Sequence, residues 1–266
     1  MVNDNVQNTG LNMPEYMYQK QEKPIQLITL LADGSSSQNQ PVAGPGSPMR
    51  IDLLNEFFQR FITTLAKDDD VNEQVRINIM VFNHEVESVL EMAFMRPRDI
   101  TIPVITAKGG TDMSLATIDG ITVTEAAYQV GKTVGNEHYR PRIVTVGDFE
   151  DSLTAEAVKM INEYNDAEMM LFDGFSTIPL NTEDPYFREP AIWCLKEAIP
   201  DEKRRLAVRT YNDLADGYQQ YADLTAMAIR IRTRTGEGEK PVILPEEDPF
   251  QRADNKLIVP HFNDLI

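Results

Sequence analysis

The chain contains short, nearly continuous runs of apolar residues that have the length of a strand. The first, residues 25–32, reads Ile-Gln-Leu-Ile-Thr-Leu-Leu-Ala. A run of this kind is typical of a strand buried on both faces, as the strands of a parallel sheet are. Residues 75–82 and 142–147 show the same pattern, and 167–172 are predicted to form a further strand.

Stretches with helical spacing of the apolar residues separate these runs. In residues 50–66 the apolar positions recur every three or four residues, which predicts a helix with one buried face. Helices are also predicted over about 110–134 and over 154–164. Residues 187–232 are predicted to be mostly helical, including the long stretch 201–232.

The alternation of strands and helices indicates crossover units on a single sheet. The predicted fold class is therefore α/β: a doubly wound, mostly parallel, Rossmann-like sheet with helices on both faces and the strand at 25–32 in its centre. Residues 85–92 alternate between apolar and polar positions after a turn at Asn83-His84. They are expected to form one antiparallel edge strand.

These elements place one domain at residues 24–232. An N-terminal extension at 1–23 and a C-terminal tail at 233–266 flank it, because neither shows sustained periodicity. Segments of that kind are mobile unless something holds them in place.

Composition limits the partners and the compartment of the protein. The formal net charge of −17 argues against nucleic acid, whose phosphates attract clustered Lys and Arg. No apolar run approaches the ~20 residues of a membrane-spanning helix, and the first residues are polar rather than leader-like. The single cysteine, Cys194, permits no internal disulfide and is expected to be buried and inert. Together these features predict a soluble, cytoplasmic protein without a membrane partner.

Candidate metal-binding residues lie in loops that follow predicted strands. The first strand leads into Asp33-Gly-Ser35-Ser-Ser37, which carries a carboxylate and two hydroxyls at alternate positions of a tight turn. Thr111 follows a Gly-Gly turn, and Asp148 follows the third apolar run. Because loops at the carboxyl ends of parallel strands share one edge of a sheet, these side chains are expected to converge. Oxygen ligands without His or Cys predict a hard cation, Mg²⁺ or Mn²⁺.

In order and approximate spacing, Asp33-x-Ser35-x-Ser37, Thr111 and Asp148 resemble the metal-ion-dependent adhesion site (MIDAS) of von Willebrand factor A (VWA) domains. The resemblance implies a VWA fold with Asp33, Ser35 and Ser37 as direct ligands of the cation. Thr111 and Asp148 would bind directly or through water. A carboxylate of a partner protein would fill the remaining position, so that the metal bridges the two proteins.

The resemblance covers residues from about 24 to about 231. Some stretches match one branch of the family well, whereas others differ from the family's usual pattern. Residues 76–82 and 108–116 look most similar to the intracellular bacterial branch that includes the TerY-like proteins of tellurite-resistance clusters. Residues 38–48, in contrast, insert a Pro- and Gly-rich loop beside the predicted metal. The usual Thr-Asp-Gly of the third motif reads Gly-Asp-Phe, so the ligand is retained but the turn after it must differ.

Other motifs have ordinary structural interpretations. Gly131-Lys132-Thr133 resembles the end of a phosphate-binding loop, but it follows a predicted helix rather than a strand and is interpreted as a helix end. Residues 68–73 resemble the start of a calcium loop, but Glu73 replaces its glycine and Ile79 stands at its twelfth position, which favours a solvated turn. The histidines are too scattered for a zinc site or a catalytic triad: His84, His138 and His261.

Two classes of function are compatible with these features. In the first, the protein is a metal-ion-dependent binding module that recruits an acidic group of a partner protein into a complex. In the second, it is a structural subunit of a large assembly, such as a virion or a secretion apparatus, with its tails as clamps. A requirement of binding for metal would separate the two. An enzyme is not expected, because no residue is placed to act as a base.

Overall fold

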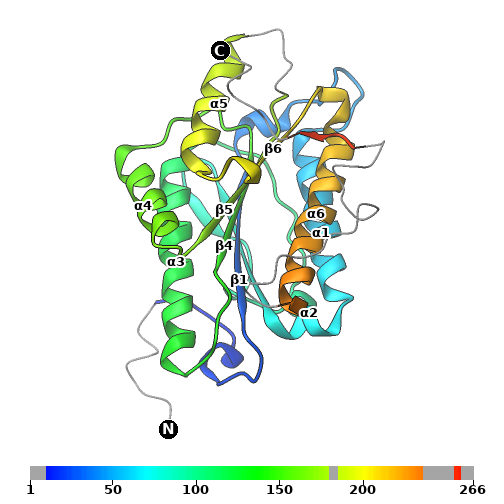
Figure 1. Ribbon diagram of the computed structural model, residues 1–266. Helices are drawn as coiled ribbons and strands as arrows, with labels where there is room; N and C mark the ends of the chain where they lie inside the picture. Colours follow the sequence, from blue (N-terminus) through cyan, green and yellow to red (C-terminus); the bar gives the residue numbers. More distant parts are fainter. Residues whose placement is uncertain (1–9, 180–184, 236–254, 259–266) are drawn as a thin grey trace.

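The structure, a computed structural model, describes residues 10–179, 185–235 and 255–258 (Figure 1). His261 and most of the tail predicted at 233–266 lie outside these residues. The described part contains one sheet of seven strands in the order β3-β2-β1-β4-β5-β6-β7. The strands are β1 (Gln26–Asp33), β2 (Val75–Phe82), β3 (Val86–Ser88), β4 (Arg142–Gly147), β5 (Leu171–Ser176), β6 (Arg205–Val208) and β7 (Leu257–Ile258).

The first strand lies in the middle of the sheet. β1 runs parallel to both of its neighbours, with Leu30 paired with Ile79 of β2 on one side and with Val144 of β4 on the other. Every residue of β1 and β2 is buried, as their apolar runs predict. β4, β5 and β6 continue in parallel, whereas β3 pairs antiparallel with β2. The predicted α/β class, the mostly parallel sheet and the antiparallel edge strand are thus confirmed.

Helices cover both faces of the sheet (Figure 1). On one face α1 and α6 lie side by side, with α2 at their end; α3, α4 and α5 cover the other face. The α-helices are α1 (Arg50–Ala66), α2 (Asp69–Gln74), α3 (Met113–Thr133), α4 (Ala155–Asp166), α5 (Pro185–Ala198) and α6 (Leu214–Thr235). The Gly-Lys-Thr sequence at 131–133 is the last turn of α3, which confirms its interpretation as a helix end.

Aromatic side chains join α6 to α1 and to the sheet. Phe57 of α1 stacks on Tyr221 of α6 with ring centroids 5.8 Å apart, and Tyr221 stacks on Phe175 of β5 at 4.9 Å. Tyr218 meets Phe175 edge-on at 5.1 Å. All four rings are buried. Because aromatic pairs stabilise a core beyond the area they bury, this cluster fixes α6 against the face of the sheet.

The strand predicted at 167–172 was misplaced by four residues. It lies at Leu171–Ser176, because Glu168, with a φ of 54°, still belongs to the turn after α4. Asp173 resembles a turn residue in the sequence, yet it is buried within the strand because two arginines pair with its carboxylate.

The continuous helix predicted over 201–232 was also wrong. α6 begins only at Leu214, and the chain before it forms β6, which pairs in parallel with β5. A strand of four residues is too short to show a recognisable period. β7 pairs antiparallel with β6 and adds a second antiparallel edge that the sequence prediction lacked.

The edge strand predicted over 85–92 is shorter than expected. Its ladder with β2 stops where the Val89 N–H donates to the Ile79 carbonyl at 3.0 Å. It resumes at Met95, which exchanges two hydrogen bonds with Ile77 at 2.8 and 2.9 Å. The chain bends away from the sheet between these two points.

Residues 10–23, which belong to the predicted N-terminal extension, pack against the domain. Met17, in a 3₁₀ turn at Glu15–Tyr18, is fully buried. The Tyr16 ring lies between two guanidinium groups, 4.8 Å from that of Arg76 and 4.4 Å from that of Arg96. These contacts hold residues 10–23 against the end of the sheet where β1 and β2 begin. The loops of the predicted metal site lie at the other end of the strands.

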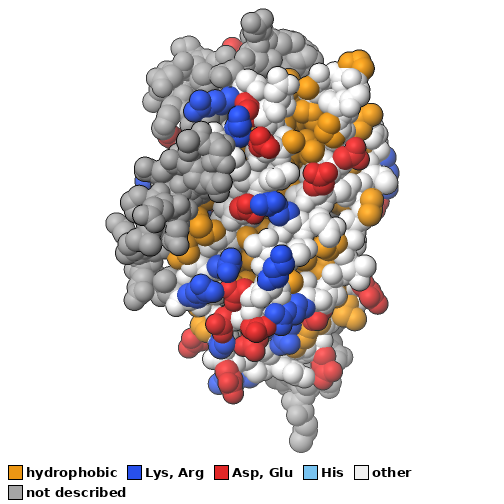
Figure 2. Space-filling model, turned by 90° about the vertical axis from the view of Figure 1, so that its right-hand side faces the viewer, with side chains coloured by type: hydrophobic (Ala, Val, Ile, Leu, Met, Phe, Trp, Pro, Cys, Tyr) orange, Lys and Arg blue, Asp and Glu red, His pale blue; other side chains and the backbone are white. Residues whose placement is uncertain are grey.

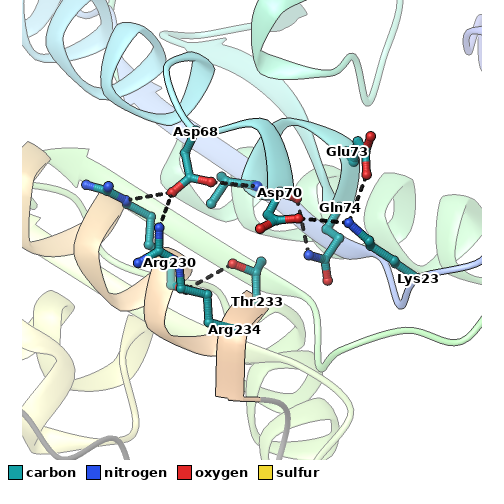
Figure 3. A network of polar contacts seen from close by, with 9 residues as sticks. Lys23, Asp68, Asp70, Glu73, Gln74, Arg230, Thr233 and Arg234 are labelled. Carbon is teal, nitrogen blue, oxygen red and sulfur yellow. Dashed lines mark hydrogen bonds and ion pairs between the residues drawn. The ribbon is translucent and has the colours of Figure 1, made fainter.

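Asp68 joins the end of α6 to the start of α2 (Figure 3). Its carboxylate accepts hydrogen bonds from Arg230 Nε at 3.2 Å, Arg234 Nη2 at 2.8 Å and the Val71 N–H at 3.3 Å. Burial alone would raise the pKa of Asp68, but the Val71 N–H and the two arginines lower it. The solvated turn predicted for 68–73 is therefore wrong, because residues 69–74 form α2 and Asp68 caps it with a side chain that is 8% exposed.

We expect Asp68→Ala to lower the free energy of unfolding by about 1–2 kcal/mol, because it removes a helix cap and the anion shared by two arginines. Lys23→Ala is the matched control, since Lys23 pairs with Asp70 and Glu73 at the exposed surface of the same region (Figure 3). Its loss should be clearly smaller, because ion pairs at the exposed surface contribute little. Urea unfolding measures both, and equal losses would contradict a special role of Asp68.

Candidate metal centre

Two buried aspartates meet at the carboxyl ends of adjacent strands. Asp33 is the last residue of β1, and Asp148 directly follows β4. Since β1 and β4 are parallel neighbours with Ala32 paired to Val146, the two chains leave the sheet side by side. The Asp148 N–H lies 3.4 Å from Asp33 Oδ2, and each aspartate is 1% exposed.

Both serines of the first motif join this pair. Ser37 Oγ donates to Asp148 Oδ2 at 2.6 Å, and Ser35 Oγ lies 2.8 Å from Ser37 Oγ. The Ser35 N–H donates to Asp33 Oδ1 at 2.9 Å. A hydroxyl that donates its proton to a carboxylate keeps its own lone pairs for a cation. Four of the five predicted residues therefore form one hydrogen-bonded group.

Thr111 reaches the same edge on a different loop. The Lys108 N–H donates to the Gly34 carbonyl at 2.8 Å, and the Ser36 N–H donates to the Gly109 carbonyl at 3.1 Å, so the two loops are tied together. Thr111 is half-buried and precedes Asp112, the N-cap of α3. Within the described residues no hydrogen bond joins Thr111 to the other four, so its membership of the site remains a prediction.

The electrostatics of this group favour a cation. Burial, and after it the nearby Asp148, raise the pKa of Asp33 to about 7. Burial and Asp148 likewise raise the pKa of Glu150 to about 7. In the described part of the chain no Lys or Arg forms an ion pair with Asp33 or Asp148. Two buried carboxylates without a basic partner are costly, and a dication would offset that cost.

The donors also fit the chemistry of a hard cation. They are carboxylate and hydroxyl oxygens, which Mg²⁺ and Mn²⁺ prefer. Within residues 10–179, 185–235 and 255–258, no group of three or more His, Cys, Asp or Glu side chains is arranged to hold a metal. The hydroxyl-rich group at Asp33 is thus the metal-site candidate that this part of the chain offers.

Sequence reasoning missed two residues that shape this group, Gln38 and Gly147. Gln38, predicted only as part of a loop, is buried with its amide between the two aspartates. Gly147 has no side chain because a Cβ there would lie 2.8 Å from the Cβ of Asp33. The departure from the usual Thr-Asp-Gly was the signal for Gly147, but only the structure shows the close approach.

We expect Gly147→Ala to weaken metal binding, because the added methyl group would displace Asp33. It should also lower the free energy of unfolding by about 1–3 kcal/mol through overpacking. Gly174→Ala is a matched control in β5. A Cβ there would meet Ile199 at 2.7 Å and would not contact Asp33 or Asp148. Calorimetric titration should show weakened metal binding in the first variant alone; equal weakening in both would contradict the local explanation.

A hollow of about 430 Å³ lies beside the candidate centre, between the loop after β4 and α5. Glu150 and Asp151 line it on one side and Trp193, 56% exposed, on the other. Cys194 is buried, as predicted, and burial raises the pKa of its thiol.

Comparison with known proteins identifies a VWA-like fold. No protein-family model and no curated protein matches the chain, so the similarity is one of structure. The vWF domain of the type V pili tip protein Mfa5 from Porphyromonas gingivalis aligns with a TM-score of 0.51 and 12% identity, over 79% of this chain and 97% of that domain.

Two further solved structures are similar. The pilus adhesin SpaC from Lactobacillus rhamnosus GG aligns with a TM-score of 0.57 and 12% identity, over 81% of this chain and 32% of the adhesin. Proximal thread matrix protein 1 from the mussel byssus aligns with a TM-score of 0.53 and 16% identity, over 77% of this chain and 49% of that protein. The chain thus spans about a third of the adhesin and half of the matrix protein. At these identities the likeness concerns the fold alone.

Proposed function

We propose that the chain is a metal-ion-dependent protein-binding module that holds Mg²⁺ or Mn²⁺ at Asp33, Ser35, Ser37, Thr111 and Asp148. The observation that carries the proposal is the hydrogen-bonded group of two buried aspartates and two serines at the end of the central strand. A further support is that no basic side chain pairs with either aspartate in the described part of the chain.

The charge of these residues explains why a partner's carboxylate would bind. Asp33 and Asp148 supply at most two negative charges, and the three hydroxyl residues supply none. A dication held there would remain able to accept another anionic oxygen. With a net charge of −17, the chain would repel an acidic partner at long range, so the attraction must be local. An Asp or Glu of a partner protein is the group that fits.

Exposed apolar side chains on the loops and helices that adjoin the site's loops in the chain support a protein partner. They lie at the end of the 38–48 loop, in the loop that leads to Thr111, in the first turn of α3 and on α5. They are Met49 (40% exposed), Val104 (83%), Leu115 (37%) and Trp193 (56%). Apolar contacts around a central charged contact are typical of protein interfaces.

A different character marks the face that carries α1 and α6. Lys and Arg side chains are interleaved there with Asp and Glu over its lower half (Figure 2).

None of the helices in the described residues has both the length and the apolar composition of a membrane-spanning segment. A binding role rather than catalysis is proposed, and the Mfa5, SpaC and byssus structures are in keeping with it.

The sequence resemblance alone supports a narrower proposal, an intracellular protein of the TerY-like branch. The solved structures named above are pilus and byssus proteins and lend no support to that branch. Their names favour the second candidate function, a structural subunit of a large assembly.

Capture of a partner tests the proposal. The immobilised full-length chain is exposed to a lysate of its source in Mg²⁺ or in chelator, and bound proteins are identified by mass spectrometry. A partner retained in Mg²⁺, released by chelator and lost with Asp33→Ala supports the metal-dependent module. A partner retained equally in chelator and by Asp33→Ala would show that the structural-subunit function is correct.

A further inference from the structure

The Gln38 side chain connects the two aspartates of the candidate metal centre. Gln38 follows the last serine of the first motif, in a 3₁₀ turn at Ser36–Asn39, and is 1% exposed. Its Nε2 donates to Asp33 Oδ2 at 2.9 Å and lies 3.3 Å from Asp148 Oδ2. One neutral amide group thus bridges both carboxylates from inside the protein.

The other end of the same amide has no hydrogen-bond partner among the residues that the structure describes. Gln38 Oε1 is buried there and accepts no hydrogen bond from them. Leaving a buried acceptor unsatisfied costs free energy, and an apolar side chain of similar length would fill the same space without that cost. Packing alone therefore does not explain a glutamine here. The contacts of its Nε2 with the two carboxylates do.

These carboxylate oxygens are shared with other donors of the site. Asp33 Oδ2 also faces the Asp148 N–H, and Asp148 Oδ2 also accepts from the Ser37 hydroxyl. The amide therefore shares Asp148 Oδ2 with the Ser37 hydroxyl and fixes the Asp33 carboxylate beside it. Groups that hydrogen-bond to metal-ligating carboxylates fix their orientation, and loss of such a group typically weakens metal binding about 10- to 100-fold.

We propose that Gln38 is a sixth residue of the metal centre, a positioning residue that holds Asp33 and Asp148 in the arrangement a divalent cation requires. It acts through the two aspartates rather than as a ligand. This inference rests on the proposed function, because it assumes that the aspartates bind metal.

Titration of Mn²⁺ into the full-length chain tests the proposal. Gln38→Met keeps the length of the side chain but removes the donor, and we expect its dissociation constant for Mn²⁺ to rise about 10- to 100-fold. Gln40→Met is the matched control, since Gln40 is an exposed glutamine two residues further along the chain. It should bind Mn²⁺ as the wild type does.

The thermal midpoint separates positioning from simple packing. If Gln38 only packed, Gln38→Met would lower the thermal midpoint equally with and without Mn²⁺ and would leave the dissociation constant unchanged. This result would overturn the proposal. If the wild type itself binds no Mn²⁺, the proposed function fails and the role of Gln38 fails with it. If the wild type binds Mn²⁺ and Gln38→Met binds it equally well, the role of Gln38 is refuted and the proposed function is unaffected.

A measurement on the wild type covers the case in which Gln38→Met does not fold. In the ¹⁵N-labelled chain, the side-chain amide signal of Gln38 should shift when diamagnetic Mg²⁺ is added, because its two acceptors change their charge environment. The side-chain signal of Gln40 should stay in place. A Gln38 signal that does not respond to saturating Mg²⁺ would contradict the proposal.

Discussion

Asp173→Ala should lower the free energy of unfolding by about 3–5 kcal/mol, the largest effect of any single substitution considered for stability. Asp173 lies inside β5 and pairs with Arg142 Nε at 3.0 Å and Arg204 Nη1 at 2.8 Å. Burial alone would raise the pKa of Asp173, but the two arginines lower it. Without the carboxylate, the buried Arg142 guanidinium would be left without its counter-charge.

Urea unfolding at neutral pH measures this loss, and a double variant provides the control. Asp173→Leu combined with Arg142→Met removes both buried charges, so it should recover most of the stability. A loss below about 1 kcal/mol for Asp173→Ala would show that water or another group compensates Arg142.

In the presence of chelator, the free energy of unfolding should fall as the pH rises from about 4 to about 7. The pKa of Asp33 is raised to about 7, first by burial and then by Asp148, whereas in the unfolded chain it lies near its usual value of about 4. The folded chain therefore binds a proton that the unfolded chain has lost. Each pH unit within this window costs up to about 1.4 kcal/mol for one proton.

Other groups act outside this window, add to the decline or oppose it. Burial lowers the pKa of His138 to about 4, so this group stabilises the fold increasingly between about pH 4 and 6.5 and offsets part of the decline. Glu150, whose pKa is also raised to about 7 by burial and Asp148, acts in the same direction. Asp173 and Asp68 have lowered pKa values, so their stabilisation is complete above about pH 4 and is lost as the pH falls further. The part of the decline that is lost in Asp33→Asn is therefore assigned to the acidic group at the metal centre.

Saturating Mg²⁺ should flatten the decline, because a dication favours the ionised carboxylates that the metal-free protein disfavours. Asp33→Asn should show a shallower decline in chelator and little response to Mg²⁺. Thermal or urea unfolding at a series of pH values checks both expectations. An identical slope with and without Mg²⁺ would mean that no cation binds at these carboxylates.

The sequence predicted the central part of the fold because its strands are long and buried on both faces. β1, β2 and β4 each show a nearly continuous apolar run, which is typical of the strands of a parallel sheet covered by helices. β5 and β6 carry weaker patterns. β5 contains Asp173, a buried charge whose partners come from distant positions, and β6 has only four residues. Tertiary pairing decided both strands.

The part of the candidate site that lies directly after the strands could be predicted from the sequence. Asp33 and Asp148 end neighbouring parallel strands, and the serines follow at fixed spacing, so their meeting could be expected. The roles of Gln38 and Gly147 could not, because each depends on a close approach between loops more than a hundred residues apart. Local sequence carries no signal of such a contact.

Isothermal titration of Mg²⁺ or Mn²⁺ into the full-length chain tests the central claim most directly. The wild type should bind one ion, Asp33→Ala should bind none, and Asp70→Ala should bind like the wild type. Asp70 is the control because it is an exposed aspartate at the start of α2, which directly precedes β2. It therefore lies at the end of the sheet opposite the candidate metal centre. Equal binding by the wild type and Asp33→Ala, or no binding by the wild type, would contradict a metal centre at the end of the central strand.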